Sequence, residues 1–172
     1  MPDTHHRILG ITGWKNSGKT TLTEKLVSNL VAHGYRIATI KHAHHAFDID
    51  HEGRDSYRHR KAGASEVAIV SSKRWALIHE LENEDEPPLN EVLARLAPCD
   101  LVIIEGYKRE GHDKIEVRRA GARETTPISD HDPSIIALVS DINQPKAALP
   151  AFDLDDVEAV TRFVMQRYPL HK

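Results

Sequence analysis

The sequence has one cysteine, few aromatic residues and no long hydrophobic run. Cys99 has no partner for an intrachain disulfide, which favours a reducing compartment and excludes a disulfide-stabilised fold. The first residues, MPDTHHRILG, lack the apolar segment of a signal peptide, and no stretch has the length of a membrane span. The formal net charge of -3 gives no electrostatic reason to expect nucleic acid as a general partner. These absences predict a cytoplasmic protein with no membrane or nucleic-acid partner.

What is present is the composition of a globular protein, because 40% of the residues are hydrophobic and 28% are charged. A chain of 172 residues is long enough to bury about two-thirds of the surface that its unfolded form exposes. We find neither an internal repeat nor an independent second domain. We therefore expect a single domain over residues 1–172.

One short motif carries the strongest functional signal. GWKNSGKT, residues 13–20, matches the phosphate-loop pattern G-x-x-x-x-G-K-[ST] at every fixed position, with a strand-like segment before it and a helical pattern after it. The glycines let successive N–H groups converge on an anion, Lys19 is placed to reach the β- and γ-phosphates, and the Thr20 hydroxyl is placed to ligate Mg²⁺. The alternative is a glycine-containing turn with a surface lysine. The expected nucleotide contacts are Gly13, Trp14, Lys15, Asn16, Ser17, Gly18, Lys19, Thr20 and Thr21.

The elements around this motif indicate the fold class. The run LVII, residues 101–104, is apolar throughout, as a central parallel strand requires. Further strands are predicted in YRIATIKH, SEVAIVSS, RWALIHEL, KIEVRR and IIALVSD, and further helices in RDSYRHRKAGA, LNEVLARLA and DVEAVTRFVMQRY. Strands that alternate with helices after a phosphate loop predict a three-layer α/β P-loop NTPase fold with a mainly parallel sheet. SEVAIVSS and RWALIHEL are expected to form an antiparallel edge.

Two helices have faces that can be assigned from their spacing. The first is predicted to end at Gly34, and the last to be capped by Asp155 or Asp156. Apolar residues recur at helical intervals on the expected inner faces, which are Leu22, Leu26, Val27, Leu30 and Val31 in the first helix, and Val157, Val160, Phe163 and Val164 in the last.

Mg²⁺ on a bound triphosphate needs oxygen ligands, usually from the C-terminal ends of strands beside the phosphate loop. Glu105 ends the apolar strand, whereas Asp100 begins it. Asp100 is therefore expected at the opposite edge of the sheet, about five residues from Glu105, or roughly 16 Å at the rise of a strand. We therefore expect Glu105, with Thr20, to hold the metal. The alternative is that Glu105 caps the turn at Gly106.

Three further acidic residues, Asp48, Asp50 and Asp55, lie in or just after the loop that follows the strand predicted in YRIATIKH. Arg58 lies one helical turn after Asp55. One of the aspartates is expected to polarise an attacking water or to hold a metal-bound water, with Asp50 as the metal candidate. Asp55 and Arg58 are the catalytic candidates, since arginine can neutralise charge on a γ-phosphate. A helix cap or a solvated charge is the alternative for each of them.

The same loop contains His42, His44, His45 and His51, and imidazole suits Zn²⁺, Cu²⁺ or Ni²⁺. No cysteine accompanies them, and their spacing matches no closed zinc site. A polar loop that is solvated or contacts an anion is the favoured interpretation.

Four segments together carry a family resemblance: GWKNSGKTTL, IKHAHHAFDIDHEGRDSYRHRKAGA, RWALIHE and DLVIIEGYKREGHDKIEVRR. Over Ile8 to Asp141 the sequence resembles the bacterial molybdopterin-guanine dinucleotide biosynthesis protein B (MobB) family. The resemblance implies a GTP-binding, Mg²⁺-dependent P-loop protein that is a weak GTPase and a homodimer. It implies an adapter beside the MobA-type guanylyltransferase that joins GMP to molybdopterin, with other cofactor-assembly proteins as partners and molybdopterin as a candidate ligand.

The resemblance bears on two further positions. The family is similar to the signal-recognition-particle GTPases, whose D-T-Y-R motif resembles residues 55–58 here, which strengthens the catalytic candidates Asp55 and Arg58. The sequence contains no N-K-x-D motif for reading guanine. Asp141, in LVSD, lies where a base-reading carboxylate is expected, although an aspartate there is also an ordinary turn residue.

Two other functions remain open at this point, a P-loop kinase of small molecules and a nickel or zinc metallochaperone GTPase. The first requires a lid and an acceptor pocket, and the second requires metal ligands in the histidine loop. Lys108, Arg109 and Arg118 could meet an anionic pterin phosphate or an acidic partner, or could form a solvated strand face.

Overall fold

The computed structural model describes residues 6–43, 47–124, 126–142 and 148–170. Contacts divide the chain into two compact units. The first unit comprises Met1–His42 and Leu93–Lys172, and the second comprises Ala43–Val92. The expectation of one domain over residues 1–172 stays a prediction.

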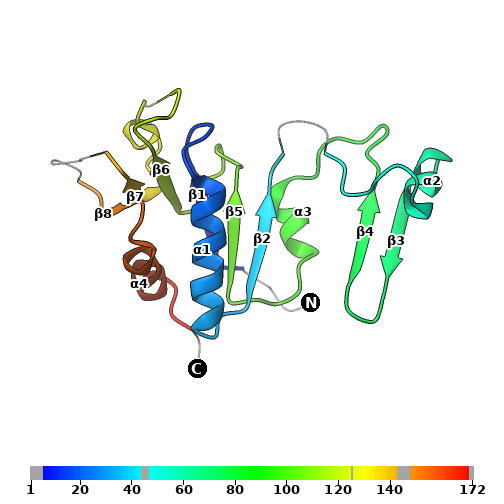
Figure 1. The fold of residues 1–172 in the computed structure, drawn as a ribbon, viewed down its shortest axis with the longest axis horizontal. Helices are drawn as coiled ribbons and strands as arrows, with labels where there is room; N and C mark the ends of the chain where they lie inside the picture. The colour runs from blue at the N-terminus through cyan, green and yellow to red at the C-terminus, as the bar shows by residue number, and fades with distance from the viewer. Residues whose placement is uncertain (1–5, 44–46, 125, 143–147, 171–172) are drawn as a thin grey trace. The chain divides into compact units, whose positions relative to one another are not determined.

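The first unit is built on a six-stranded sheet in which every pair of neighbouring strands is parallel, in the order β2-β5-β1-β6-β7-β8 (Figure 1). The predicted mainly parallel α/β fold is therefore confirmed. β8 was not predicted from the sequence, because it is only 3 residues long. The strands are β1 (Ile8–Thr12), β2 (Ile37–Lys41), β5 (Leu101–Glu105), β6 (Lys114–Arg118), β7 (Ile135–Ser140) and β8 (Ala151–Asp153).

Helices α1 (Lys19–Ala32) and α4 (Val157–Arg167) lie together on one face of this sheet (Figure 1). Alternate strand residues point toward the helices, as the two-residue period of a strand requires. The prediction that Val31 faces inward is wrong, because 53% of this residue is exposed. Phe163, predicted to face inward on the last helix, is partly buried. The buried contacts come from Leu22, Leu26, Leu30, Val157, Val160 and Val164 on the helices and from Leu9, Ile11, Leu101, Ile103, Ile115, Val117, Ala137 and Val139 on the strands.

Both residues predicted to cap helices satisfy a helix end, although Gly34 follows the C-cap of α1, which is His33. Gly34 has a φ of 89°, and its N–H donates to the Val31 carbonyl, which satisfies the end of α1. The Asp156 side chain accepts a hydrogen bond from the Ala159 N–H and so caps α4.

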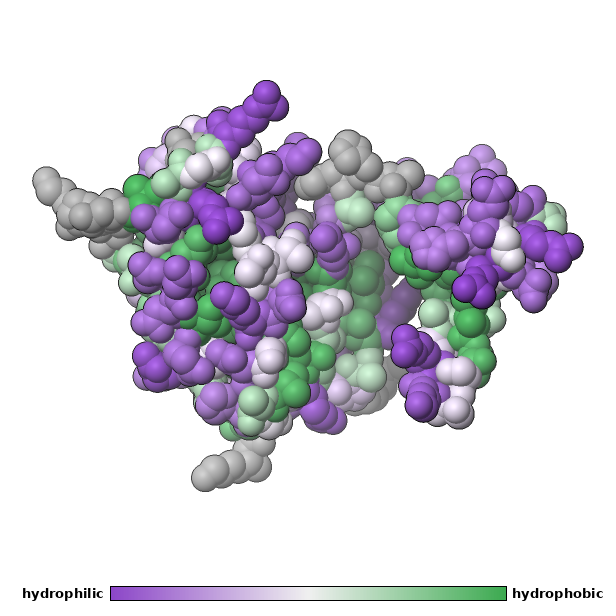
Figure 2. Space-filling view, in the orientation of Figure 1, coloured by the Kyte–Doolittle hydropathy of each residue, from purple (hydrophilic) through white to green (hydrophobic). Residues whose placement is uncertain are grey.

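The second unit contains α2 (Asp55–Lys61) and an antiparallel pair, β3 (Glu66–Val70) and β4 (Trp75–His79). The antiparallel pairing was predicted, but the pair was expected at the edge of the main sheet, whereas it forms a separate two-stranded sheet. α3 (Leu89–Ala94) begins in this unit and ends in the first. Hydrophobic surface is visible along the β3–β4 hairpin in Figure 2, where the exposed apolar residues are Ile69, Val70, Trp75 and Leu77.

None of the helices in the described ranges combines the length and apolar character needed to cross a bilayer.

Candidate functional site

The phosphate loop connects β1 to α1, with Gly18 as the N-cap of the helix. Gly13, Asn16 and Gly18 all have positive φ, at 148°, 65° and 97°. A Cβ at position 13 would lie 2.4 Å from the Val117 carbonyl oxygen and 2.6 Å from Ser17 Oγ, which real structures do not tolerate. Glycine is therefore required at position 13 by contact as well as by backbone conformation.

Two polar side chains in this turn are arranged for an anion. Ser17 is 1% exposed, and its hydroxyl has no hydrogen-bond partner among the residues that the structure describes. Lys19 Nζ donates to the Trp14 carbonyl oxygen at 2.7 Å. Burial lowers the pKa of Lys19, and the nearby Lys108 and Lys41 lower it further, against the opposing effect of Glu105. A phosphate would relieve this repulsion between cations and would provide acceptors for both side chains.

The predicted metal ligands Thr20 and Glu105 lie together beside the loop. Thr20 Oγ1 is 3.1 Å from each carboxylate oxygen of Glu105, and Lys41 Nζ is 3.8 Å from Glu105 Oε1. The hydroxyl and the carboxylate are hard oxygen donors, so this pair fits Mg²⁺. Asp100 directly precedes β5, at the other edge of the sheet, and accepts a hydrogen bond from the Arg36 N–H at 2.7 Å.

The predicted base-reading residue, Asp141, follows β7 at the carboxyl edge of the sheet. Its Oδ1 accepts a hydrogen bond from the Ala120 N–H at 2.7 Å, and its Oδ2 is 4.0 Å from Arg119 Nε. Arg119 also lines a cavity of about 130 Å³ together with Gly18, Thr21 and Leu154. The cavity therefore extends from the phosphate loop to the side chain that pairs with Asp141.

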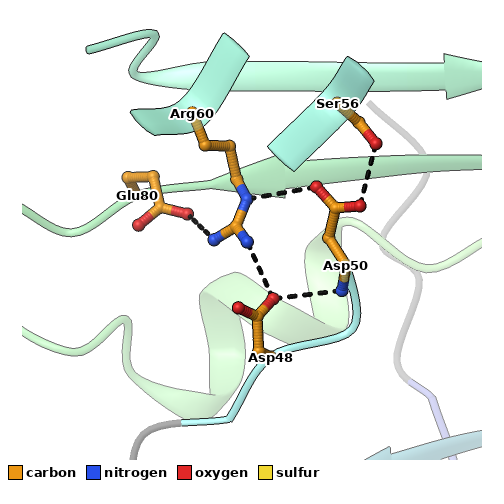
Figure 3. A network of polar contacts seen from close by, with 5 residues as sticks. All are labelled: Asp48, Asp50, Ser56, Arg60 and Glu80. Carbon is orange, nitrogen blue, oxygen red and sulfur yellow. Dashed lines mark hydrogen bonds and ion pairs between the residues drawn. The ribbon is translucent and has the colours of Figure 1, made fainter. Parts of the chain in front are cut away.

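The second unit holds the other metal candidate, Asp50, in a network around one arginine (Figure 3). Asp50 is 6% exposed, and its carboxylate accepts hydrogen bonds from Ser56 Oγ at 2.8 Å and from Arg60 Nε at 3.4 Å. Arg60 also donates to Asp48 and Glu80, each at 2.8 Å. The Asp50 N–H and Arg60 lower the pKa of Asp48. The network anchors the 48–50 turn to α2, and metal binding by Asp50 stays a prediction.

The catalytic candidates are also in the second unit. Asp55 and Arg58 lie one turn apart on α2, with 3.7 Å between Asp55 Oδ1 and Arg58 Nη1. Their side chains are 88% and 76% exposed. The phosphate loop belongs to the first unit, so their role in hydrolysis stays a prediction.

The histidine loop is described only in part, because His44 and His45 lie outside the described residues. The His42 ring packs against Tyr107, with 4.5 Å between the ring centroids. Within the described ranges, no three histidine, cysteine, aspartate or glutamate side chains are grouped as metal ligands.

One polar feature next to the site was missed in the sequence, namely the buried face of β6 that is turned away from α1 and α4. Lys114, Glu116 and Arg118 alternate on this face, and each is buried, with exposures of 1%, 0% and 8%. Glu116 accepts hydrogen bonds from the Ile128 and Ser129 N–H groups at 2.8 and 3.0 Å and from Arg118 Nη2 at 2.8 Å. Arg118 is thus neither an exposed anion ligand nor part of a solvated face. The alternation in KIEVR was the available signal.

Lys114 completes these contacts. Its ammonium donates to the Glu110 carbonyl, to Asp132 at 3.0 Å and to Ser134 at 2.6 Å. The segment 126–134, which includes a 3₁₀ turn at Ile128–Asp130, is therefore held against β6 by polar contacts. This segment also reaches the phosphate loop, because Trp14 Nε1 donates to the Thr126 carbonyl oxygen at 2.7 Å.

Comparison with known proteins agrees with this geometry. Residues 8–141 match the family model described as molybdopterin guanine dinucleotide synthesis protein B, MobB. The chain is 39% identical over 163 residues to the molybdopterin-guanine dinucleotide biosynthesis adapter protein of Escherichia coli, covering 92% of this chain and 91% of the relative. It is 39% identical over 136 residues to the protein of the same name from Haemophilus influenzae, covering 77% and 74% of the two chains.

Solved structures give the same result. A crystal structure of a MobB protein homologue from Bacillus stearothermophilus is 29% identical, covers 94% of this chain and 97% of its own, and has a TM-score of 0.72. A crystal structure of a molybdopterin-guanine biosynthesis protein B is 28% identical, covers 95% and 99%, and has a TM-score of 0.73. On the family match, the relatives and the shared fold, this chain belongs to the MobB family.

Proposed function

We propose that this chain is a GTP-binding adapter in the assembly of molybdopterin guanine dinucleotide. The observation that carries the proposal is the phosphate loop, in which the positive-φ glycines, Lys19 and the Thr20–Glu105 pair converge on one turn. The relatives from Escherichia coli and Haemophilus influenzae, which are named biosynthesis adapter proteins, support the assignment to this process.

In this proposal the loop binds the triphosphate of GTP, and Thr20 with Glu105 holds Mg²⁺. The metal, when bound, neutralises charge on the phosphate oxygens. Lys19 moves from the Trp14 carbonyl to a phosphate, and Ser17 donates its buried hydroxyl to another phosphate oxygen. Asp141 accepts the N1 and N2 protons of guanine, which requires that its carboxylate exchange the Ala120 N–H for the base.

Hydrolysis of GTP is slow in this proposal. Asp55 polarises the attacking water, Arg58 neutralises charge on the γ-phosphate, and Asp50 contacts a metal-bound water. Both side chains are exposed, which leaves the Asp55 carboxylate accessible to water and the Arg58 guanidinium accessible to a phosphate. Replacing Asp55 with alanine should lower the GTP hydrolysis rate by about 100-fold, as expected for loss of a general base. Asp85→Ala, which removes another exposed aspartate, is the matched control and should hydrolyse GTP at the wild-type rate. If Asp55→Ala also hydrolyses GTP at the wild-type rate, Asp55 is not catalytic.

The partner of the adapter is a guanylyltransferase of the MobA type, together with other cofactor-assembly proteins, and the adapter acts as a homodimer. The exposed apolar side chains of the β3–β4 hairpin, with Val70 76% and Trp75 72% exposed, support a protein contact at this surface. Val70→Asp should shift the chain from dimer to monomer in analytical ultracentrifugation, whereas Lys73→Ala should leave the dimer intact.

The adapter role is tested by the affinity of the chain for the guanylyltransferase, measured by biolayer interferometry with GTP and Mg²⁺, with GDP and without nucleotide. We expect GTP to change the dissociation constant by about tenfold or more, which corresponds to about 1.4 kcal/mol. Lys19→Ala should abolish the dependence on GTP, and Lys73→Ala should retain it. Equal affinity in all three states contradicts a role for the nucleotide in partner binding.

A further inference from the structure

A groove in the first unit lies beside the phosphate loop and has no role in the function proposed above. Its volume is about 860 Å³, within the range of small-molecule sites. Trp14 is the phosphate-loop residue that lines it, and no residue of Gly18–Thr21 does. We call it the Trp14 groove, and the residues that matter to its chemistry are Trp14, Lys108, Arg109, Pro127, Ile128 and His131.

The aromatic wall of the Trp14 groove is fixed in place. The hydrogen bond from Trp14 Nε1 to the Thr126 carbonyl sets the orientation of the indole. Lys108 Nζ lies 4.8 Å from the centroid of the indole ring, so a cation sits over an aromatic face. When the Lys108 side chain turns from the indole toward a phosphate, the ring face that it leaves can stack against a planar ring, and the Nε1 hydrogen bond limits the side-chain entropy that Trp14 loses on binding.

A second part of the lining, contributed by the segment 126–134, is also preorganised. Ile128 is held by its N–H bond to the buried Glu116, and Ser134 and Asp132 are held by the buried Lys114. These contacts hold the segment 126–134 in place through side chains and backbone groups of the chain itself. The Trp14 groove therefore resembles the preformed pockets that bind small molecules.

The available charge at the rim is positive. Of the acidic residues that line the groove, Asp132 is paired with Lys114, and Asp113 is paired with Arg167, leaving the exposed Glu110. Arg109 is exposed and makes no ion pair with any residue in the described part of the chain, and Lys108 contacts the indole ring. Two cations beside an aromatic face suit a ligand that combines a planar ring with an anion.

We propose that the Trp14 groove binds a planar bicyclic heterocycle that carries a phosphate, with its ring on Trp14 and its phosphate at Lys108 and Arg109. A pterin phosphate is the source that the proposed function favours, so the identity of the ligand depends on that function. A guanine nucleotide has the same chemistry and is the second source. In either case the groove and the phosphate loop share Trp14, so two ligands would bind next to one another.

The test is isothermal titration of the full chain with neopterin monophosphate, and in parallel with GMP, with unphosphorylated neopterin and with inorganic phosphate. Arg109→Ala should weaken binding of the phosphorylated heterocycle by about tenfold, as expected for loss of a charge-assisted hydrogen bond. Trp14→Leu should weaken it by roughly tenfold through loss of stacking. Arg162→Ala removes an exposed arginine from α4 and is the matched control, which should bind as the wild type does.

A second measurement does not depend on the folding of the Trp14 variant. In Trp75→Phe, Trp14 is the remaining tryptophan, and a ring stacked on it should quench its fluorescence. Quenching by neopterin monophosphate supports a pterin source, and quenching by GMP alone supports a guanine source.

Lys19→Ala separates this inference from the proposed function. It should abolish GTP binding and leave binding of neopterin monophosphate unchanged. Three results overturn the inference: neither heterocycle binds, binding is insensitive to Arg109→Ala, or binding is lost in Lys19→Ala because the ligand occupies the phosphate loop. In the first two cases GTP binding is unaffected, so the proposed function stands.

Discussion

Replacing Glu116 with alanine is expected to destabilise the first unit strongly. The carboxylate is fully buried and accepts three hydrogen bonds, one from Arg118 and two from the Ile128 and Ser129 N–H groups. The substitution leaves the buried guanidinium without its carboxylate and both N–H groups without their acceptor. Each of these changes costs free energy, because a buried polar group without a partner has lost its hydration.

The magnitude follows from these contacts. Removing one partner of a buried ion pair costs about 3–5 kcal/mol, and an unsatisfied buried N–H about 1–3 kcal/mol. The effects share one site and do not add, so we expect a loss of about 4 kcal/mol in the free energy of unfolding. Since domains of this size are stable by only about 5–15 kcal/mol, a loss of about 4 kcal/mol removes between roughly a quarter and four-fifths of the free energy of unfolding.

Urea denaturation followed by circular dichroism measures this loss. Glu24→Ala, which removes an exposed glutamate from α1, is the control and should change stability by less than about 0.5 kcal/mol. Glu116→Leu combined with Arg118→Met should recover part of the loss, because an apolar pair has no buried charge to compensate. A loss below about 1 kcal/mol for Glu116→Ala refutes the account of β6.

Three other predictions concern the loop, the metal and pH. Gly13→Ala should weaken nucleotide binding by at least about tenfold, because its Cβ would lie 2.4 Å from a backbone oxygen. Gly121→Ala, whose Cβ has nothing within 4 Å, should bind nucleotide as the wild type does. Equal titration curves for the two variants contradict the prediction. Glu105→Gln should reduce the gain in GTP affinity from Mg²⁺ by about tenfold, and an unchanged gain means that another group holds the metal. His79 has a pKa raised above 6.5 by its hydrogen bonds to two glutamates. The protonated His79 ring therefore contributes to stability fully below about pH 6.5, and this contribution is lost as pH rises through the raised pKa. In urea titrations, His79→Gln should be more destabilising at about pH 5.5 than at about pH 8.5.

The parts of the fold that were predicted correctly depend on local patterns. The phosphate loop requires glycine at particular backbone positions, and Gly13 and Gly18 have the positive φ values expected. The run 101–104 is apolar because β5 is buried on both faces, and its end places Glu105 next to Thr20. The glycines of the loop and the apolar run of β5 are each recognised from residues that are close together in the sequence, whereas the pairing of Glu105 with Thr20, 85 positions apart, follows from the parallel order of the strands.

The features that were missed depend on contacts between distant segments. KIEVR gives no sign that Glu116 is satisfied by the backbone of residues 128 and 129, which lie 12 and 13 positions later. Val31 continues the helical apolar pattern, but it lies at the edge of the packed face and is exposed. The β3–β4 pair was recognised from its alternation, and that alternation does not specify which sheet the pair joins.

The most direct test of the central claim is equilibrium titration of the purified chain with GTP and with ATP, each with and without Mg²⁺, using Lys19→Ala as the control. We predict that GTP binds at least about tenfold more tightly than ATP, a difference of about 1.4 kcal/mol, and that Lys19→Ala removes binding of both nucleotides. ATP binding that equals or exceeds GTP binding, or GTP binding that survives in Lys19→Ala, contradicts a guanine nucleotide held by this phosphate loop.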